Sequence, residues 1–103
     1  MRTQITGRHR PVSEDLRERA ERVLQRLASH ASRPVDATVT FDNHSAQCSV
    51  ELRLHLSSGD MLVASATAAD HRSALDRAEQ KLRRQLEKAP RARRSRRAGT
   101  GPQ

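Results

Sequence analysis

The sequence predicts an α+β domain in which a four-stranded mixed sheet carries two helices on one face, with the element order β-α-β-β-β-α. Apolar residues recur at helical spacing in two stretches, near 14–30 and 70–88, and alternate with polar residues over 35–68. The 103 residues suffice for one small domain. Hydrophobic residues make up 34% of the chain and Phe41 is its one aromatic residue, so we expect an aliphatic core.

The first strand and first helix are predicted from local signals. The run RTQITG at 2–7 is typical of a short strand that Gly7 ends. Ser13 is a suitable N-cap, and acidic residues follow it in the first turn, where the helix dipole favours negative charge. The helical pattern stops before Pro34, since a proline disfavours helix at the preceding residue. The apolar stripe of this helix consists of Leu16, Ala20, Val23, Leu24 and Leu27.

Three further strands are predicted where apolar residues alternate with polar ones. The runs DNHS at 42–45 and SSGD at 57–60 supply the turns between them. One crossover followed by two hairpins gives the strand order 1-2-3-4, with the first two strands parallel and the others antiparallel. Because the alternation is one-sided, both helices must cover the same face. The other face has no aromatic residue to stack bases, so the helices are the better candidate surface for RNA.

The last helix, capped by Asp70 and predicted over 70–88, has two contrasting sides. On a wheel of about 100° per residue, four apolar residues fall within about 80° and form the buried stripe. Four cations recur at i, i+4, i+7 and i+11 on the opposite side. Such charges repel one another unless a polyanion lies across them, so the pattern predicts contact with a nucleic-acid backbone. The apolar residues are Leu75, Ala78, Leu82 and Leu86, and the cations are Arg77, Lys81, Arg84 and Lys88.

The C-terminal segment differs in composition from the rest. Residues 89–103, APRARRSRRAGTGPQ, contain five arginines with proline and glycine and show no periodicity. We therefore expect Pro90 to end the last helix and a disordered Arg-rich tail to follow a folded domain over 1–88. The net charge is +8, of which +5 lies in this tail, and 18 of the 20 cations are arginine. That bias suits RNA, although a high-GC genome would also produce it.

Several classes of function are disfavoured by the residues present. Cys48 is a single cysteine, which excludes an internal disulfide. No signal-peptide core and no apolar run of about 20 residues is present, so we expect a cytoplasmic protein. The five histidines lack the spacing of a zinc site, and the glycines are isolated rather than grouped in a phosphate loop. We therefore expect no enzyme, no metal and no cofactor.

Four segments resemble one known family over roughly residues 1–88. They are ITG at 5–7, VSEDLR at 12–17, ASA at 64–66, and the run D-x-x-x-A-L-D-x-x-x-x-K-L-x-R-Q-L-x-K at 70–88. Together they are similar to the ribosome hibernation promoting factors, also called ribosome-associated inhibitors or sigma-factor modulation proteins. The last run is the specific part of the match.

The resemblance implies a fold like that of double-stranded-RNA-binding domains, and a function. Such a protein binds the small ribosomal subunit between head and body, over the decoding region. It blocks messenger and transfer RNA in stress or stationary phase. By motif position the contacts with 16S rRNA fall to Lys81, Arg84 and Lys88, and we add the neighbouring cations. The expected rRNA-binding set is Arg77, Lys81, Arg83, Arg84, Lys88 and Arg91, with secondary contacts from Arg22, Arg26, Arg93 and Arg94.

Two departures from the family pattern bear on this expectation. Arg72 stands where the motif usually has an aromatic residue. The chain also lacks the second, dimer-forming domain of the long members, so it resembles the short form, in which ribosome pairing needs a separate ribosome modulation factor. The alternative function is that of a protein-interaction regulator, such as a sigma-factor modulator, that binds an acidic protein partner.

Overall fold

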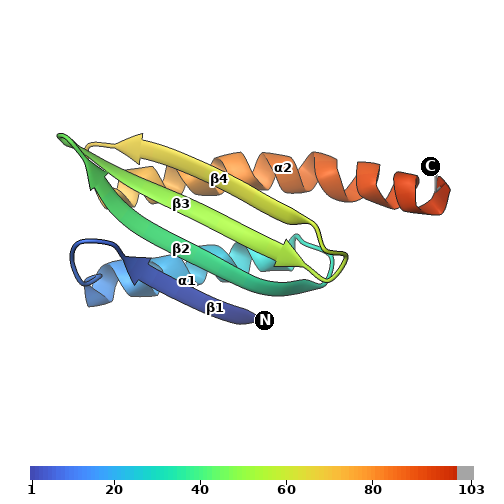
Figure 1. Ribbon diagram of the computed structural model, residues 1–103, viewed down its shortest axis with the longest axis horizontal. Helices are drawn as coiled ribbons and strands as arrows, with labels where there is room; N and C mark the ends of the chain where they lie inside the picture. The colour runs from blue at the N-terminus through green and yellow to red at the C-terminus, as the bar shows by residue number, and fades with distance from the viewer. Residues whose placement is uncertain (100–103) are drawn as a thin grey trace.

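The computed structural model describes the backbone of residues 1–99 and the side chains of residues 1–88. A four-stranded sheet forms one layer and two helices form the other, all on one face of the sheet (Figure 1). This confirms the predicted α+β class and element order. The elements are β1 Arg2–Gly7, α1 Glu14–Ser29, β2 Pro34–His44, β3 Gln47–Leu56, β4 Met61–Ala68 and α2 His71–Gly99.

The sheet has the predicted order and one-sided pattern. The strand order is β1-β2-β3-β4, with β1 parallel to β2 and the other pairs antiparallel. Val39, Leu52 and Ala64 lie in one register row and are all buried beneath the helices. The neighbouring row on the other face consists of Thr40, Glu51 and Ser65, which are polar and partly or fully exposed. The open face is therefore polar, as expected.

The core is aliphatic and is shared by both helices and the sheet. Leu24 and Leu27 of α1 and Leu75 and Leu82 of α2 are at most 1% exposed. The inward residues of β4 are one leucine and three alanines, and their small size lets α2 approach the strand closely. The apolar stripes predicted for the two helices are confirmed. Phe41 joins the core with its ring edge-to-face against His71, at a centroid distance of 5.3 Å.

Both helices begin with the predicted caps, and the turns use left-handed residues. The Ser13 hydroxyl accepts a hydrogen bond from the Leu16 amide at 3.2 Å, and the Asp70 carboxylate accepts one from the Ser73 amide at 2.7 Å. The β3–β4 turn places Gly59 at φ 97°. In that region a side chain is strained, which accounts for glycine there.

The end of α2 differs from the prediction. Pro90 does not stop the helix, which continues to Gly99. A proline inside a helix removes one backbone hydrogen bond and strains the preceding turn, but alanine and arginine, which follow it, are good helix formers and can continue the helix. Residues 100–103 of the expected disordered tail lie outside the described residues, and the division into 1–88 and 89–103 stays a prediction. No helix within residues 1–99 is long and apolar enough to cross a membrane.

Candidate nucleic-acid interface

The four cations predicted to share one side of α2 do share it. We call Arg77, Lys81, Arg84 and Lys88 the α2 ridge. All four are exposed, and helical geometry places them within about 60° of one another, away from the buried stripe. No carboxylate occurs along this line, because the acidic residues of the helix lie toward α1 or on the outer flank.

Half of the α2 ridge is held against the free edge of β4. Arg77 Nη1 donates to the Thr67 carbonyl oxygen at 2.9 Å, and Lys81 Nζ donates to the Ser65 carbonyl oxygen at 2.9 Å. Gln85 Nε2 continues the row one helical turn on, donating to the carbonyl oxygen of Val63 at 2.8 Å. We call these contacts the β4 edge row.

The β4 edge row depends on a match between two repeats. Four helical residues rise about 6.0 Å, and two strand residues rise about 6.6–6.8 Å. Donors four residues apart on α2 therefore lie opposite carbonyls two residues apart on β4. Each of these cations uses one N–H in this contact. Lys81 therefore keeps two donors for a ligand, and Arg77 keeps four. These contacts therefore fix the positions of the two cations and leave most of their donors available. Gln85 was not among the residues expected at this surface, although its i+8 spacing from Arg77 and i+4 spacing from Lys81 could have indicated it.

The remaining members of the α2 ridge are unpartnered. Among the described side chains, Arg84 and Lys88 make no hydrogen bond and no ion pair. Both side chains are exposed to solvent. An exposed cation with no partner is available for a phosphate at no cost in existing contacts.

The opposite flank of α2 pairs with α1 instead. Asp76 lies 3.7 Å from Arg19, and Arg83 Nη2 lies 3.3 Å from His30 Nε2. Arg83 is therefore separated from the α2 ridge and faces α1. Among the side chains that the structure describes, the expected site residues on α2 thus fall into two groups, of which the ridge forms one continuous cationic line.

Arg26, expected as a secondary RNA contact, instead joins α1 to α2 through a pair of hydrogen bonds. Its Nε and Nη2 donate to the two oxygens of Glu79 at 2.9 and 3.1 Å. The Glu79 hydrogen bonds raise the pKa of Arg26 above its usual value. This guanidinium is therefore largely committed to the fold. Arg22 is exposed and has no partner among the described side chains, whereas the side chains of Arg91, Arg93 and Arg94 lie outside the described residues.

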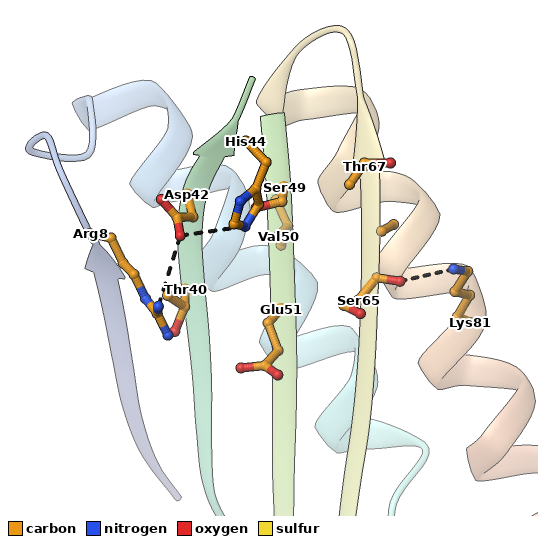
Figure 2. A pocket seen from close by; sticks show the side chains of 11 residues that line it. Arg8, Thr40, Asp42, His44, Ser49, Val50, Glu51, Ser65, Thr67 and Lys81 are labelled. Carbon is orange, nitrogen blue, oxygen red and sulfur yellow. Dashed lines mark hydrogen bonds and ion pairs between the residues drawn. The ribbon is translucent and has the colours of Figure 1, made fainter. Parts of the chain in front are cut away.

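A hollow of about 470 Å³ lies on the open face of the sheet, next to the α2 ridge (Figure 2). Arg8 and Lys81 stand at its two sides. Asp42 lines it, and its Oδ2 lies 3.9 Å from Arg8 Nη1 and 3.7 Å from His44 Nε2. The hydrogen bond from the Asn43 amide, assisted by His9, lowers the pKa of Asp42. Because Asp42 and Glu51 offset these cations, the hollow is a weaker phosphate site than the ridge.

The part of the chain that the structure describes holds no group of three or more His, Cys, Asp or Glu side chains placed to bind a metal ion. Cys48 is half-buried on the helix side of the sheet, where its Sγ lies 3.7 Å from the Ala69 carbonyl oxygen.

Comparison with known proteins agrees with this description. The chain is similar to a solved ribosomal subunit interface protein from Coxiella burnetii, with 26% identity and a TM-score of 0.77 over 87% of this chain and 98% of that one. It also resembles the N-terminal domain of Protein Y from Thermus thermophilus, with 24% identity and a TM-score of 0.72 over 84% and 96% of the two chains, a likeness of fold.

No curated protein matches the chain significantly by sequence. The sequence does match one family, described as sigma 54 modulation protein / S30EA ribosomal protein, over residues 3–94. This range includes α1, β2 to β4, all but the first residue of β1 and α2 as far as residue 94, and therefore the α2 ridge. The protein therefore belongs to the sigma 54 modulation protein / S30EA ribosomal protein family.

Proposed function

We propose that this protein binds the small ribosomal subunit through the α2 ridge and inhibits translation by occupying the decoding region. The domain would keep messenger and transfer RNA from their sites during stress or stationary phase. Membership of a family that includes ribosomal proteins and the likeness to a ribosomal subunit interface protein support a ribosomal target.

The observation that carries the proposal is the α2 ridge itself. Arg77 and Lys81 are oriented by backbone carbonyls, and Arg84 and Lys88 have no partner among the described side chains. Four cations spaced about one helical turn apart can contact successive phosphates of an RNA strand. If about five phosphates are contacted in all, affinity should fall on the order of 10²- to 10³-fold between 50 and 200 mM salt.

The test is co-sedimentation of the protein with purified small subunits at low and physiological salt. Replacing Lys81, Arg84 and Lys88 by glutamate should abolish saturable binding while circular dichroism shows an intact fold. The matched control replaces Arg2, Arg10 and Arg53, which are exposed elsewhere, by glutamate and makes the same change in net charge. Equal loss in both variants would indicate non-specific attraction, and unimpaired binding by the ridge variant would refute the proposal.

A second comparison concerns the Arg-rich C-terminal segment. Replacing Arg91, Arg93 and Arg94 by alanine should weaken binding severalfold without abolishing it, because the ridge supplies the remaining phosphate contacts. Complete loss of binding in this variant would move the site away from the folded domain.

The proposal involves occupancy alone. We expect neither catalysis nor a cofactor, and we expect pairing of ribosomes to require a separate ribosome modulation factor. Inhibition should therefore be stoichiometric with ribosomes. In a translation assay, a sub-stoichiometric amount of protein that silenced all ribosomes would contradict this mechanism.

A further inference from the structure

The two edges of the sheet are treated differently. At the β4 edge, the outward carbonyls of Val63, Ser65 and Thr67 accept hydrogen bonds from α2 side chains. An edge whose acceptors are occupied is a poor template for a further strand. At the other edge of the sheet, β1 has no comparable cover.

The outward backbone groups of β1 can be identified from the ladder. The Arg8 amide donates to the Phe41 carbonyl oxygen at 3.0 Å, which continues the parallel pairing of β1 with β2. Because strand residues alternate in direction, the amides of Thr3, Ile5 and Gly7 point away from β2. No hydrogen bond to the outward groups of these three residues occurs within the described part of the chain.

The two sides of the β1 edge have different chemistry. On the helix side, Ile5 and Val12 are only partly buried and form an apolar shelf beside the core. The Arg10 carbonyl oxygen is nearest to the position that a Cβ on Gly7 would take, and Val12 Cγ2 lies 3.1 Å from it, so the loop after β1 covers the helix side of the strand at Gly7. On the open side lie two cations, Arg2 and Arg8. Arg2 faces this side because it pairs with the outward residue Asp36, and Arg8 lines the hollow on this face.

We propose that the β1 edge is a docking site for an extended segment of a partner protein in which acidic and apolar residues alternate. The segment would add as a fifth strand by hydrogen bonding to Thr3 and Ile5. Its side chains would alternate between the two faces, placing apolar residues on the shelf and carboxylates near Arg2 and Arg8.

Charge decides between this occupant and a second copy of the chain. Residues 1–10 contain Arg2, Arg8 and Arg10 and no aspartate or glutamate. Two copies paired through β1 would bring these arginines together, with only Asp36 and Asp42 of each copy to offset them. An acidic segment neutralises them instead.

The probe is a fluorescent peptide of about ten residues with alternating Glu and Val at its centre, a length that covers the six residues of β1. Two comparison peptides carry Lys in place of Glu, or the same residues arranged in blocks. Anisotropy with the full-length protein should show at least about tenfold tighter binding of the alternating acidic peptide, because only this peptide matches both faces of the edge. Amide resonances of Thr3, Ile5 and Gly7 should shift on binding.

Two variants test the mode of binding. Thr3→Pro removes an outward amide and leaves the β1–β2 ladder intact. It should therefore lower the affinity for the alternating acidic peptide about tenfold or more. Should this proline unfold β1, the double variant R2E/R8E keeps the backbone and should instead favour the Lys peptide. The ridge variant K81E/R84E/K88E should bind the acidic peptide normally, which separates this proposal from ribosome binding.

The proposal is overturned if the three peptides bind equally, or if the shifts map to α2 and β4. Concentration-dependent dimerisation that Thr3→Pro abolishes would also overturn it, because a second copy would then occupy the edge. A peptide that binds wild type and Thr3→Pro equally would exclude strand addition at β1.

Discussion

The contact of Arg26 with Glu79 provides the sharpest test of how α1 is fastened to α2. The two residues are 53 positions apart in sequence and form two hydrogen bonds of 2.9 and 3.1 Å. The environments of the partners differ. Glu79 is 8% exposed, whereas the Arg26 side chain is 53% exposed. Removing one partner therefore has a different consequence from removing the other.

The magnitude follows from this asymmetry. A hydrogen bond to a charged group contributes about 1.5–3 kcal/mol when shielded, and the exposure of Arg26 reduces this value. Glu79→Gln leaves Arg26 free to turn into water, so we expect a loss of about 1 kcal/mol in the free energy of unfolding. Arg26→Met leaves a covered carboxylate without its partner, so we expect a loss of about 2 kcal/mol. The double variant R26M/E79Q should lose less than the sum of both losses.

The assay is urea unfolding followed by circular dichroism, on the four proteins of this double-mutant cycle. The reasoning is refuted if Glu79→Gln costs as much as Arg26→Met, or if the two losses are additive. Subunit co-sedimentation of Arg26→Met supplies a second readout. If this variant keeps its stability but loses ribosome binding, Arg26 contacts RNA and the interhelical contact is secondary.

Three further predictions concern stability. Leu82 is 0% exposed, so Leu82→Ala should lower the free energy of unfolding by about 3 kcal/mol, measured by urea unfolding. A loss below about 1 kcal/mol would contradict the packing described. Gln85→Ala leaves the Val63 carbonyl without its α2 donor and should cost about 0.5–1 kcal/mol, whereas an unchanged unfolding midpoint would mean that water replaces the contact fully. The hydrogen bond from the Ser73 amide lowers the pKa of Asp70, so its carboxylate stabilises the fold above the unfolded pKa of about 3.9, and this contribution is lost as pH falls through the lower folded value. The midpoint temperature of thermal unfolding should therefore fall less steeply for Asp70→Ala than for wild type between about pH 5 and pH 2. Parallel curves of midpoint against pH would disprove the role of this cap.

Much of the fold follows from local patterns in the chain. The caps at Ser13 and Asp70, the turn at Gly59 and the one-sided alternation of the strands depend on residues close in sequence, and the structure confirms each of them. The end of α2 was predicted wrongly, because Pro90 is a strong stop signal in isolation. A helix that is already anchored by its packed first turns can tolerate the loss of one hydrogen bond.

The candidate site, like the fold, could be predicted from the sequence only where it depends on local patterns. The sequence by itself determined that four cations share one side of α2, because the helical repeat places residues 77, 81, 84 and 88 together wherever the helix lies. It could not reveal what lies beside them. The partners of Arg77 and Lys81 are backbone carbonyls, which every residue has, and no side-chain pattern identifies them.

Only the tertiary structure decided which cations remain free. Arg26 and Arg83 have the same exposed helical setting in sequence as Arg84, yet packing brings Glu79 to the first and His30 to the second, each across 53 positions. The same packing covers the β4 edge and leaves β1 open. The physical reason is that helical periodicity is local, whereas the position of a helix over a sheet is set by the shared core, and that position decides whether an exposed charge meets a partner or solvent.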